Sequence, residues 1–147
     1  MSAESERRSG NRATVEKAFG LLSQQRHKEI AELITDDIDF ELPYGPGQKP
    51  LAVRGSKPWM ALNDATWPAF ARFSLAITNV YELADPDRLI VEYQSDGEVR
   101  TTGKPYRNRY IGVFRFRDGQ YVAVSGNGGK LLLHGFSRLY AVDHRRR

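Results

Sequence analysis

Three carboxylates could carry out acid–base chemistry on a small molecule, and they are Glu41, Asp64 and Glu92. Proton transfer near neutral pH needs an ionisable group in an apolar cavity, where desolvation shifts its pKa, together with donors for the developing oxyanion. Glu41 and Glu92 lie on predicted strands, where each could equally face solvent. Asp64 lies on a predicted helix beside Asn63 and is the candidate catalytic base, with a surface position on that helix as the alternative.

Aromatic and amide side chains could form the wall of a binding site. Tyrosine combines an apolar ring with a hydroxyl donor, a combination common in concave ligand sites. The ligand-binding candidates are Tyr44, Trp59, Trp67, Tyr93, Asn108 and Tyr110. Asn108 is the one polar side chain on an otherwise aromatic strand face, so we expect it to donate a hydrogen bond to a substrate carbonyl. The alternative role for the aromatic residues is packing in the core or at an interface.

Other chemistries find no support in the residue types or their spacing. None of the three histidines, His27, His134 and His144, has a partner at metal-ligand spacing, so no metal site is predicted. The chain has no cysteine, and it has no G-x-S-x-G motif, which argues against a nucleophilic mechanism. No glycine-rich loop joins a strand to a helix, so no nucleotide cofactor is expected.

Length and composition indicate one domain. The chain has 147 residues, of which 40% are hydrophobic, enough for a single core. The lack of cysteine and of an apolar leader predicts a cytoplasmic protein, and the longest apolar run is too short to cross a membrane. The net charge of +4 is largely at the two ends. A nucleic-acid partner is a minor alternative that depends on Arg107, Arg109, Arg115 and Arg117.

Three helices are predicted in the first half of the chain. Residues 1–10 are polar and are expected to be a disordered tail. Apolar residues at spacings of three and four predict a helix from about Asn11 to Gln25, followed by a short one over residues 27–34. A third helix should start with Ser56 as its N-cap, and it carries the two tryptophans.

Antiparallel strands are predicted to follow. They span residues 38–42, 73–83, 88–95, 108–116 and 121–124, with turns at 35–37, 96–97 and 118–119. Asp118-Gly119 suits the two positive-φ positions of a type I′ turn. Alternation in the long strand places Asn108, Tyr110, Gly112, Phe114 and Phe116 on one face. Helices followed by strands predict an α+β fold with helices on one face of a sheet.

Several segments together resemble the SnoaL-like branch of the nuclear-transport-factor-two-like superfamily. The similarity runs from Asn11 to about Val124 and includes DDIDFELPYGPG and GKPYRNRYIGVFRFRDGQ. NRATVEK (residues 11–17) and DPDRLIVEY (residues 85–93) are most similar to the phenazine biosynthesis A/B proteins. The resemblance implies a cone-shaped roll, in which a strongly bent antiparallel sheet wraps around a cavity closed by helices. It also implies a homodimer that pairs through the back of the sheet.

The chain departs from that family's pattern after Val124. The place of the phenazine proteins' acidic glutamate falls on Gly126, and that of their pocket histidine falls near Leu62. We hypothesise that residues 125–147 result from a reading-frame slip, because one choice of codons for residues 125–130 gives Arg-Glu-Trp-Trp-Lys, the usual family motif, in another frame. The alternative is a genuine glycine-rich turn followed by a strand or helix.

Two functions remain open on this basis. The first is a cofactor-free isomerase, cyclase or dehydratase of secondary metabolism that acts by acid–base chemistry on a small molecule. The second is a ligand-binding or dimerisation module without catalysis, which the missing acid and histidine favour. Fold alone does not choose between them.

Overall fold

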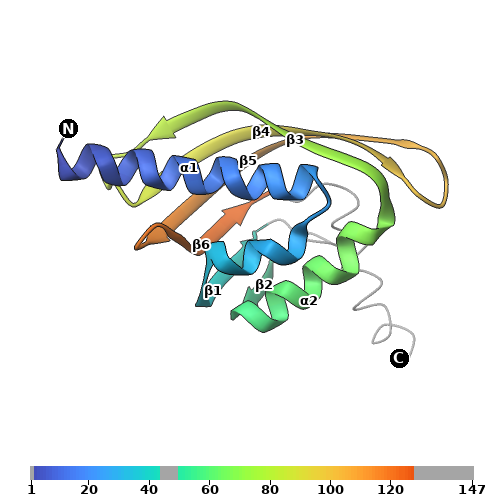
Figure 1. The fold of residues 1–147 in the computed structure, drawn as a ribbon, viewed down its shortest axis with the longest axis horizontal. Coiled ribbons are helices and arrows are strands. Elements are labelled where there is room, and N and C mark those ends of the chain that lie inside the picture. Colours follow the sequence, from blue (N-terminus) through green and yellow to red (C-terminus); the bar gives the residue numbers. More distant parts are fainter. Residues whose placement is uncertain (1, 44–49, 128–147) are drawn as a thin grey trace.

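Two α-helices, α1 (Ala3–Ser23) and α2 (Ser56–Thr66), lie on one side of a six-stranded sheet in the computed structural model, which describes residues 2–43 and 50–127 (Figure 1). A 3₁₀ helix, η1 (His27–Leu33), connects α1 to the first strand, and a single turn, η3 (Trp67–Ala69), follows α2. Helices packed on one face of a sheet confirm the predicted α+β class.

The sheet has the strand order β2-β1-β6-β5-β4-β3. Its strands are β1 (Ile34–Leu42), β2 (Leu51–Arg54), β3 (Phe70–Glu82), β4 (Arg88–Val99), β5 (Pro105–Arg117) and β6 (Gln120–Gly126). Four of the neighbouring pairs are antiparallel, whereas β1 and β6 run parallel. The sheet is therefore mixed, and the expectation of an antiparallel sheet was wrong for this pair. A hairpin makes its two strands antiparallel, but no hairpin joins β1 to β6, so the local sequence does not set their relative direction.

The β5–β6 hairpin forms as the sequence predicts. Asp118 and Gly119 have φ angles of 52° and 78°, the two positive values that a type I′ turn requires. Along β5 the side chains alternate between buried and exposed, and Tyr110, Gly112 and Phe114 lie on the buried face. This face forms part of the concave side of the sheet, beneath α1.

The predicted turn at Asp96-Gly97 is wrong, because β4 continues to Val99. A Cβ atom at Gly97 would lie 2.8 Å from the backbone oxygen of Arg72 on β3. The register of β3 against β4 shifts between Phe70 and Arg72. Glycine at this position therefore permits β3 and β4 to approach closely near an irregularity. This is a common role of glycine within a strand, as distinct from its role in turns.

Helix α1 begins at Ala3 rather than near Asn11, so residues 3–10 are helical and not the expected disordered tail. Long-range contacts hold this part of the helix. The Arg8 guanidinium donates to the backbone oxygen of Leu83 at 2.7 Å. Asn11, which is 1% exposed, donates from Nδ2 to the backbone oxygen of Pro86 at 3.1 Å and to Oδ1 of Asp87 at 3.3 Å. The β3–β4 turn thus anchors the helix.

Two other boundaries differ from the predictions. The segment from Thr35 to Asp37, expected to be a turn, belongs to β1, where Asp37 pairs with Arg117 of β5. The N-cap of α2 is Gly55, with a φ of 95°, and not Ser56. Left-handed backbone geometry, which glycine adopts readily, turns the chain from β2 into α2.

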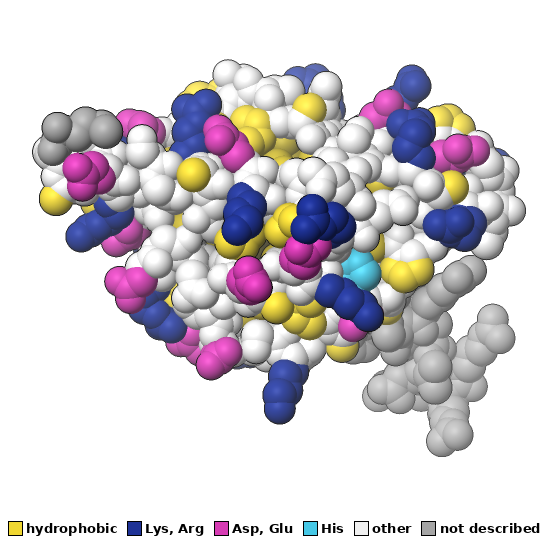
Figure 2. Space-filling model, in the orientation of Figure 1, with side chains coloured by type: hydrophobic (Ala, Val, Ile, Leu, Met, Phe, Trp, Pro, Cys, Tyr) yellow, Lys and Arg dark blue, Asp and Glu magenta, His cyan; other side chains and the backbone are white. Residues whose placement is uncertain are grey.

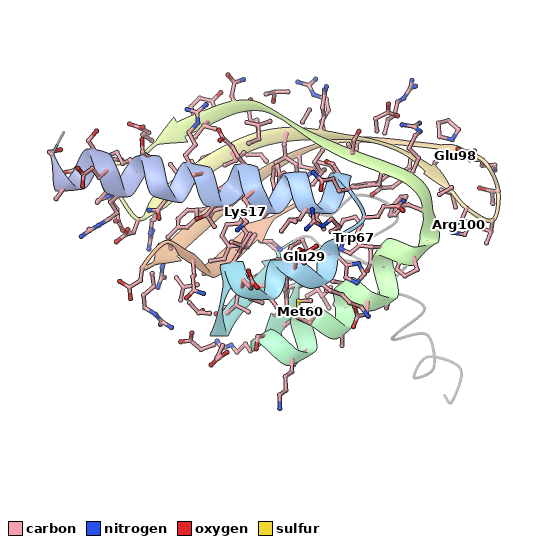
Figure 3. The ribbon with its side chains drawn as sticks, viewed as in Figure 1. Lys17, Glu29, Met60, Trp67, Glu98 and Arg100 are labelled. Carbon is pink, nitrogen blue, oxygen red and sulfur yellow. The ribbon has the colours of Figure 1, made fainter. Side chains whose placement is uncertain are left out.

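The core lies between the helices and the concave face of the sheet. Its larger part includes Val15 and Ala18 of α1, and Ile38, Leu89 and Val91 of the sheet, all of them 1% exposed or less. A smaller aromatic cluster of Phe70, Phe73 and Tyr106, with Trp67 packed against it, lies where α2 leads into β3. Figure 3 shows Trp67 close to this junction, near the labelled Arg100.

Candidate functional site

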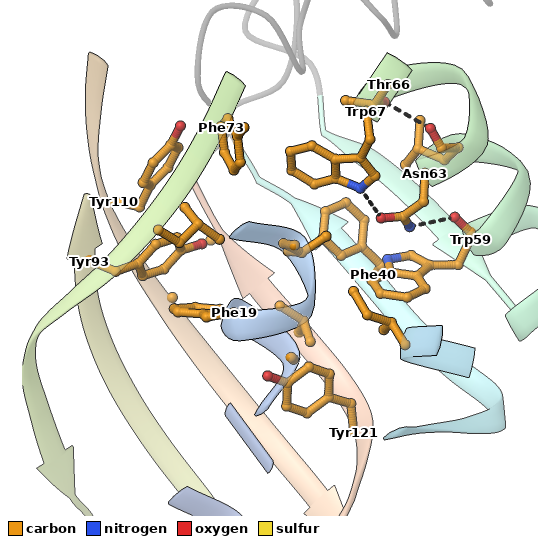
Figure 4. Close-up of a pocket in the computed structure, with 18 of the residues that line it drawn as sticks. Phe19, Phe40, Trp59, Asn63, Thr66, Trp67, Phe73, Tyr93, Tyr110 and Tyr121 are labelled. Atoms are coloured by element: carbon orange, nitrogen blue, oxygen red, sulfur yellow. Dashed lines mark hydrogen bonds between the residues drawn. The ribbon is translucent and has the colours of Figure 1, made fainter. Parts of the chain in front are cut away.

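An apolar cavity of about 120 Å³ lies between α1, α2 and the concave face of the sheet. Aromatic rings from both sides form most of its wall, and Figure 4 shows Tyr93, Tyr110 and Phe19 on one side with Trp59, Trp67 and Phe40 on the other. The Phe19 ring of α1 lies 4.7 Å from that of Tyr93 on β4, measured between centroids. Helix α1 therefore contributes to the cavity wall as well as to the core.

Four of the six ligand-binding candidates line this cavity, and they are Trp59, Trp67, Tyr93 and Tyr110. Asn108 does not line it, although it is half-buried on the same face of β5 as Tyr110. Tyr44 lies outside the described residues. The structure thus brings the aromatic candidates together but leaves the predicted amide donor out of the wall.

Asp64, the candidate base, does not line the cavity either. Its side chain is 52% exposed, and Oδ1 lies 2.7 Å from Nε2 of His27 on η1. Of the other two carboxylates, Glu41 is exposed, and Glu92 accepts a hydrogen bond from Asn79. The His27–Asp64 pair connects η1 to the outer side of α2, an arrangement that residue spacing could not indicate because the two are 37 positions apart.

The neighbouring residue Asn63, which is 7% exposed, does line the cavity. Its Nδ2 donates to the backbone oxygen of Trp59 at 2.8 Å, and its Oδ1 accepts a 2.6 Å hydrogen bond from the Trp67 indole. Successive helical residues point about 100° apart, so the aspartate next to Asn63 faces away. The amide thus ties the Trp67 indole to the backbone of α2 at Trp59, and this use leaves it less free to bind a ligand.

Three hydroxyl groups form a chain at one side of the cavity. The Tyr110 hydroxyl lies 2.9 Å from Oγ of Ser95 and donates to the Tyr106 hydroxyl at 3.3 Å. The Tyr93 ring is stacked on that of Tyr110, with centroids 4.8 Å apart and an interplanar angle of 18°. Burial raises the pKa of the Tyr93 phenol, and the neighbouring Tyr110 raises it further. Tyr93 therefore stays protonated near neutral pH.

Tyr121 on β6 is a cavity residue that the sequence predictions did not include. It is 3% exposed, and its hydroxyl has no hydrogen-bond partner within the described part of the chain. Burial raises the pKa of this phenol well above its ordinary value, and Tyr93 adds to the shift. The DG turn and the alternation after it could have predicted an inward-facing ring here, but nothing in the sequence pattern indicates an unpaired hydroxyl.

Glycines create part of the open space. Gly112 of β5 and Gly126 of β6 are directly paired across the two strands, and both line the cavity. A Cβ at Gly126 would lie 2.9 Å from the backbone oxygen of Ile111, and one at Gly112 would lie 2.9 Å from the Phe114 ring. No side chain can be added at either position without movement of its neighbours.

The electrostatic character of the cavity is uniform. Among the described residues that line it, none is Asp, Glu, His, Lys or Arg. Charged side chains are spread over the outer surface instead, as Figure 2 shows for one face. The site can offer hydrogen bonds from phenols inside an aromatic wall, but the described lining provides no group that ionises near neutral pH.

No helix in the described ranges is long and apolar enough to span a membrane.

Comparisons with known proteins place this fold and sequence in a family. The model of the SnoaL-like domain matches residues 15–124. The uncharacterised protein YesE of Bacillus subtilis strain 168 is 34% identical over 112 residues, which are 74% of this chain and 74% of YesE.

Solved structures share the fold. A phenazine biosynthesis-related protein, phzb2, from Pseudomonas aeruginosa has a TM-score of 0.70 at 22% identity, with coverage of 93% of this chain and 86% of that one. RV0760c from Mycobacterium tuberculosis, in complex with estradiol-17β-hemisuccinate, has a TM-score of 0.70 at 14% identity, with coverage of 82% and 94%. At these identities the likeness concerns the fold.

Proposed function

The chain belongs to the SnoaL-like family, and from this premise we propose that it binds an uncharged ring compound in the aromatic cavity without acid–base catalysis by the residues that line it. The observation that carries the proposal is the lining itself, which has no ionisable group near neutral pH among its described members. The pKa of the Tyr93 phenol and that of the Tyr121 phenol are both raised by burial, so they are hydrogen-bond donors and not bases.

Cavity size supports a ligand with one ring inside the wall. An engineered apolar cavity of about 150 Å³ binds benzene, and the cavity here is about 120 Å³. A larger ligand would place its remaining atoms at the mouth. RV0760c, which has the same fold, is solved with a steroid ester, and this agrees with a ring compound as the type of ligand.

An isomerase, cyclase or dehydratase would need a different lining. General acid–base catalysis requires a group whose pKa lies near the working pH and which reaches the reacting atom. Asp64, the candidate from the sequence, is exposed on the far side of α2. We therefore favour binding over proton transfer for the described site.

Three compounds of one shape test the proposal: acetophenone, ethylbenzene and benzoate. Titration calorimetry should detect the two neutral compounds and not benzoate, because a carboxylate buried without a cation is strongly disfavoured. The chain has two tryptophans, Trp59 and Trp67, and both line the cavity. Their indole N–H signals in NMR spectra therefore report occupancy of the site.

Asp64→Asn is the matched control, because this side chain lies outside the cavity. The variant should bind the neutral compounds as the unaltered protein does. Binding of benzoate as tight as that of acetophenone would refute the proposal, and so would an absence of binding by all three compounds.

We further propose that two copies pair through the outer face of the sheet. Tyr81, Ile90 and Val113 are consecutive partners across β3, β4 and β5, so they form an apolar row on that face. Tyr81 is 45% and Val113 40% exposed, and Ile111 on β5 is 50% exposed. Exposed apolar side chains that are contiguous on a surface commonly mark an interface.

Light scattering on a size-exclusion column tests the pairing. The unaltered protein should elute as a dimer, and Val113→Glu should convert it to a monomer because the new carboxylate would face its own copy across a two-fold axis. Ala13→Glu, at an exposed position of α1 on the opposite side of the sheet, is the control and should stay dimeric. A monomeric unaltered protein at micromolar concentration would contradict the proposal.

A further inference from the structure

The Tyr121 hydroxyl is buried, polar and unpaired, which is rare in a folded protein. Ring packing sets its position, since Tyr121 lies 5.4 Å from Phe114 and 5.5 Å from Phe116 between centroids. Its backbone oxygen accepts a hydrogen bond from the Thr35 hydroxyl at 3.2 Å. The phenol is therefore held rigidly while its hydroxyl lacks a partner among the described residues.

Several other polar groups of the wall are already engaged. The Tyr110 hydroxyl interacts with Ser95, and the Asn63 amide uses both its oxygen and its nitrogen on the two tryptophan residues. The Thr66 hydroxyl donates to the backbone oxygen of Leu62 at 2.8 Å. A ligand that hydrogen-bonds to any of these groups would compete with an existing bond, whereas a bond to Tyr121 would satisfy a group that has none.

We infer that Tyr121 is the polar anchor of the cavity and donates a hydrogen bond to a neutral acceptor oxygen, such as a ketone, ester or ether oxygen, on a ring compound. This inference rests on the proposed function and adds the chemical class of the ligand. Figure 4 shows Tyr121 among the cavity rings, at the opposite end of the view from Phe73 and Trp67. The ring of a ligand would contact the aromatic wall, and its oxygen would point towards β6.

A neutral acceptor fits better than an anion. The described lining includes no cation that could offset the desolvation of a carboxylate. A negative charge beside the Tyr121 and Tyr93 hydroxyls would meet only neutral donors among the described lining residues. The phenol of Tyr121 remains protonated near neutral pH and can serve as the donor.

The test compares acetophenone with ethylbenzene, which has a similar shape but no oxygen. The acetophenone carbonyl loses its hydrogen bonds to water on entry, and the Tyr121 hydroxyl should replace one of them. In Tyr121→Phe the affinity for acetophenone should fall about tenfold relative to that for ethylbenzene, the effect of one net hydrogen bond, with ethylbenzene affinity unchanged. Tyr93→Phe removes the other nearby phenol and should keep most of the discrimination.

Different failures have different meanings. If neither compound binds to the unaltered protein, the proposed function is wrong. If both bind but Tyr121→Phe leaves the ratio of the two affinities unchanged, or Tyr93→Phe lowers it as much as Tyr121→Phe does, the function stands and the anchor is not Tyr121. Thermal melting establishes that Tyr121→Phe is folded, and its melting temperature should not fall, because the variant loses only an unpaired hydroxyl.

An infrared measurement needs no variant. The carbonyl stretch of acetophenone should shift to lower frequency in the complex, relative to its position in an alkane, because a hydrogen bond weakens the C=O bond. A stretch at the alkane position in the saturated complex would overturn the inference, since the oxygen would then lie in an apolar part of the cavity.

Discussion

Replacement of Asn11 by alanine should destabilise the protein by removing the anchor between α1 and the β3–β4 turn. Asn11 is 1% exposed, and its Nδ2 donates to the backbone oxygen of Pro86 and to Oδ1 of Asp87. Alanine keeps the helical propensity and leaves both acceptors without this donor. The Asp87 carboxylate keeps a long ion pair with Arg7, at 3.5 Å.

The size of the effect follows from the two bonds. A neutral hydrogen bond contributes about 1 kcal/mol, and a bond to a charged acceptor about 1.5 kcal/mol or more. The Asn11–Asp87 distance of 3.3 Å places that bond at the lower end. We therefore expect a loss of about 2–3 kcal/mol in the free energy of unfolding. For a chain of this size that corresponds to a fall of about 6–10 °C in melting temperature.

Differential scanning calorimetry measures the change, with Arg12→Ala as the control. Arg12 is the next residue on the same helix, but it is exposed and forms only a surface ion pair with Glu16. Its loss should shift the melting temperature by about 1 °C or less. Equal shifts for the two variants would refute the reasoning, because they would mean that general helix stability, and not the anchor, controls the result.

Two other predictions concern the sheet, and a third concerns the encoding DNA. Gly112→Ala should destabilise the protein by about 1–3 kcal/mol in urea titrations, because the Phe114 ring must move; an unchanged midpoint would mean that the ring moves at no cost. A hydrogen bond from Arg117 lowers the pKa of Asp37 to about 2, so the stabilisation is present above the ordinary value near 3.8 and is lost as pH falls through about 2. In Arg117→Gln, NMR titration should find the pKa of Asp37 raised but still below 3.8, because a hydrogen bond from Thr35 also lowers it; a value still near 2 would exclude Arg117 as the main cause. Finally, the encoding DNA after Val124 should contain the Arg-Glu-Trp-Trp-Lys codons in another frame, and codons that cannot give this reading would disprove the frame slip.

Local patterns predicted those parts of the fold that depend on neighbours in the sequence. The DG turn required positive φ at Asp118 and Gly119, and alternation in β5 placed Tyr110 and Phe114 on the concave face. Both features depend on backbone geometry over a few residues. Local pattern also explains the wrong prediction of a turn at Asp96-Gly97. A glycine in a turn and a glycine where two paired strands approach closely look the same in the local sequence.

Long-range contacts account for what the sequence could not predict. The first turns of α1 carry no apolar stripe, and Arg8 and Asn11 hold them by bonds to residues about 75 positions away. The packing of α2 against η1 and β1 decides which face of the helix turns inward, and therefore that Asn63 and not Asp64 lines the cavity. The unpaired hydroxyl of Tyr121 depends on every side chain around it. None of these properties belongs to a single segment.

The two segments that most resemble the phenazine proteins, residues 11–17 and 85–93, help to shape the cavity. Asn11 in the first of them bonds to Pro86 and Asp87 in the second. Eight residues along α1, about 12 Å further at 1.5 Å per residue, Phe19 packs against Tyr93 in the cavity wall. The anchor at one end of the helix thus helps to set the position of this ring at the other. The two segments thus help to shape the cavity, whereas the chemistry of the site depends on the polar side chains that line it, which in the described part of the chain are phenols, amides and one threonine hydroxyl.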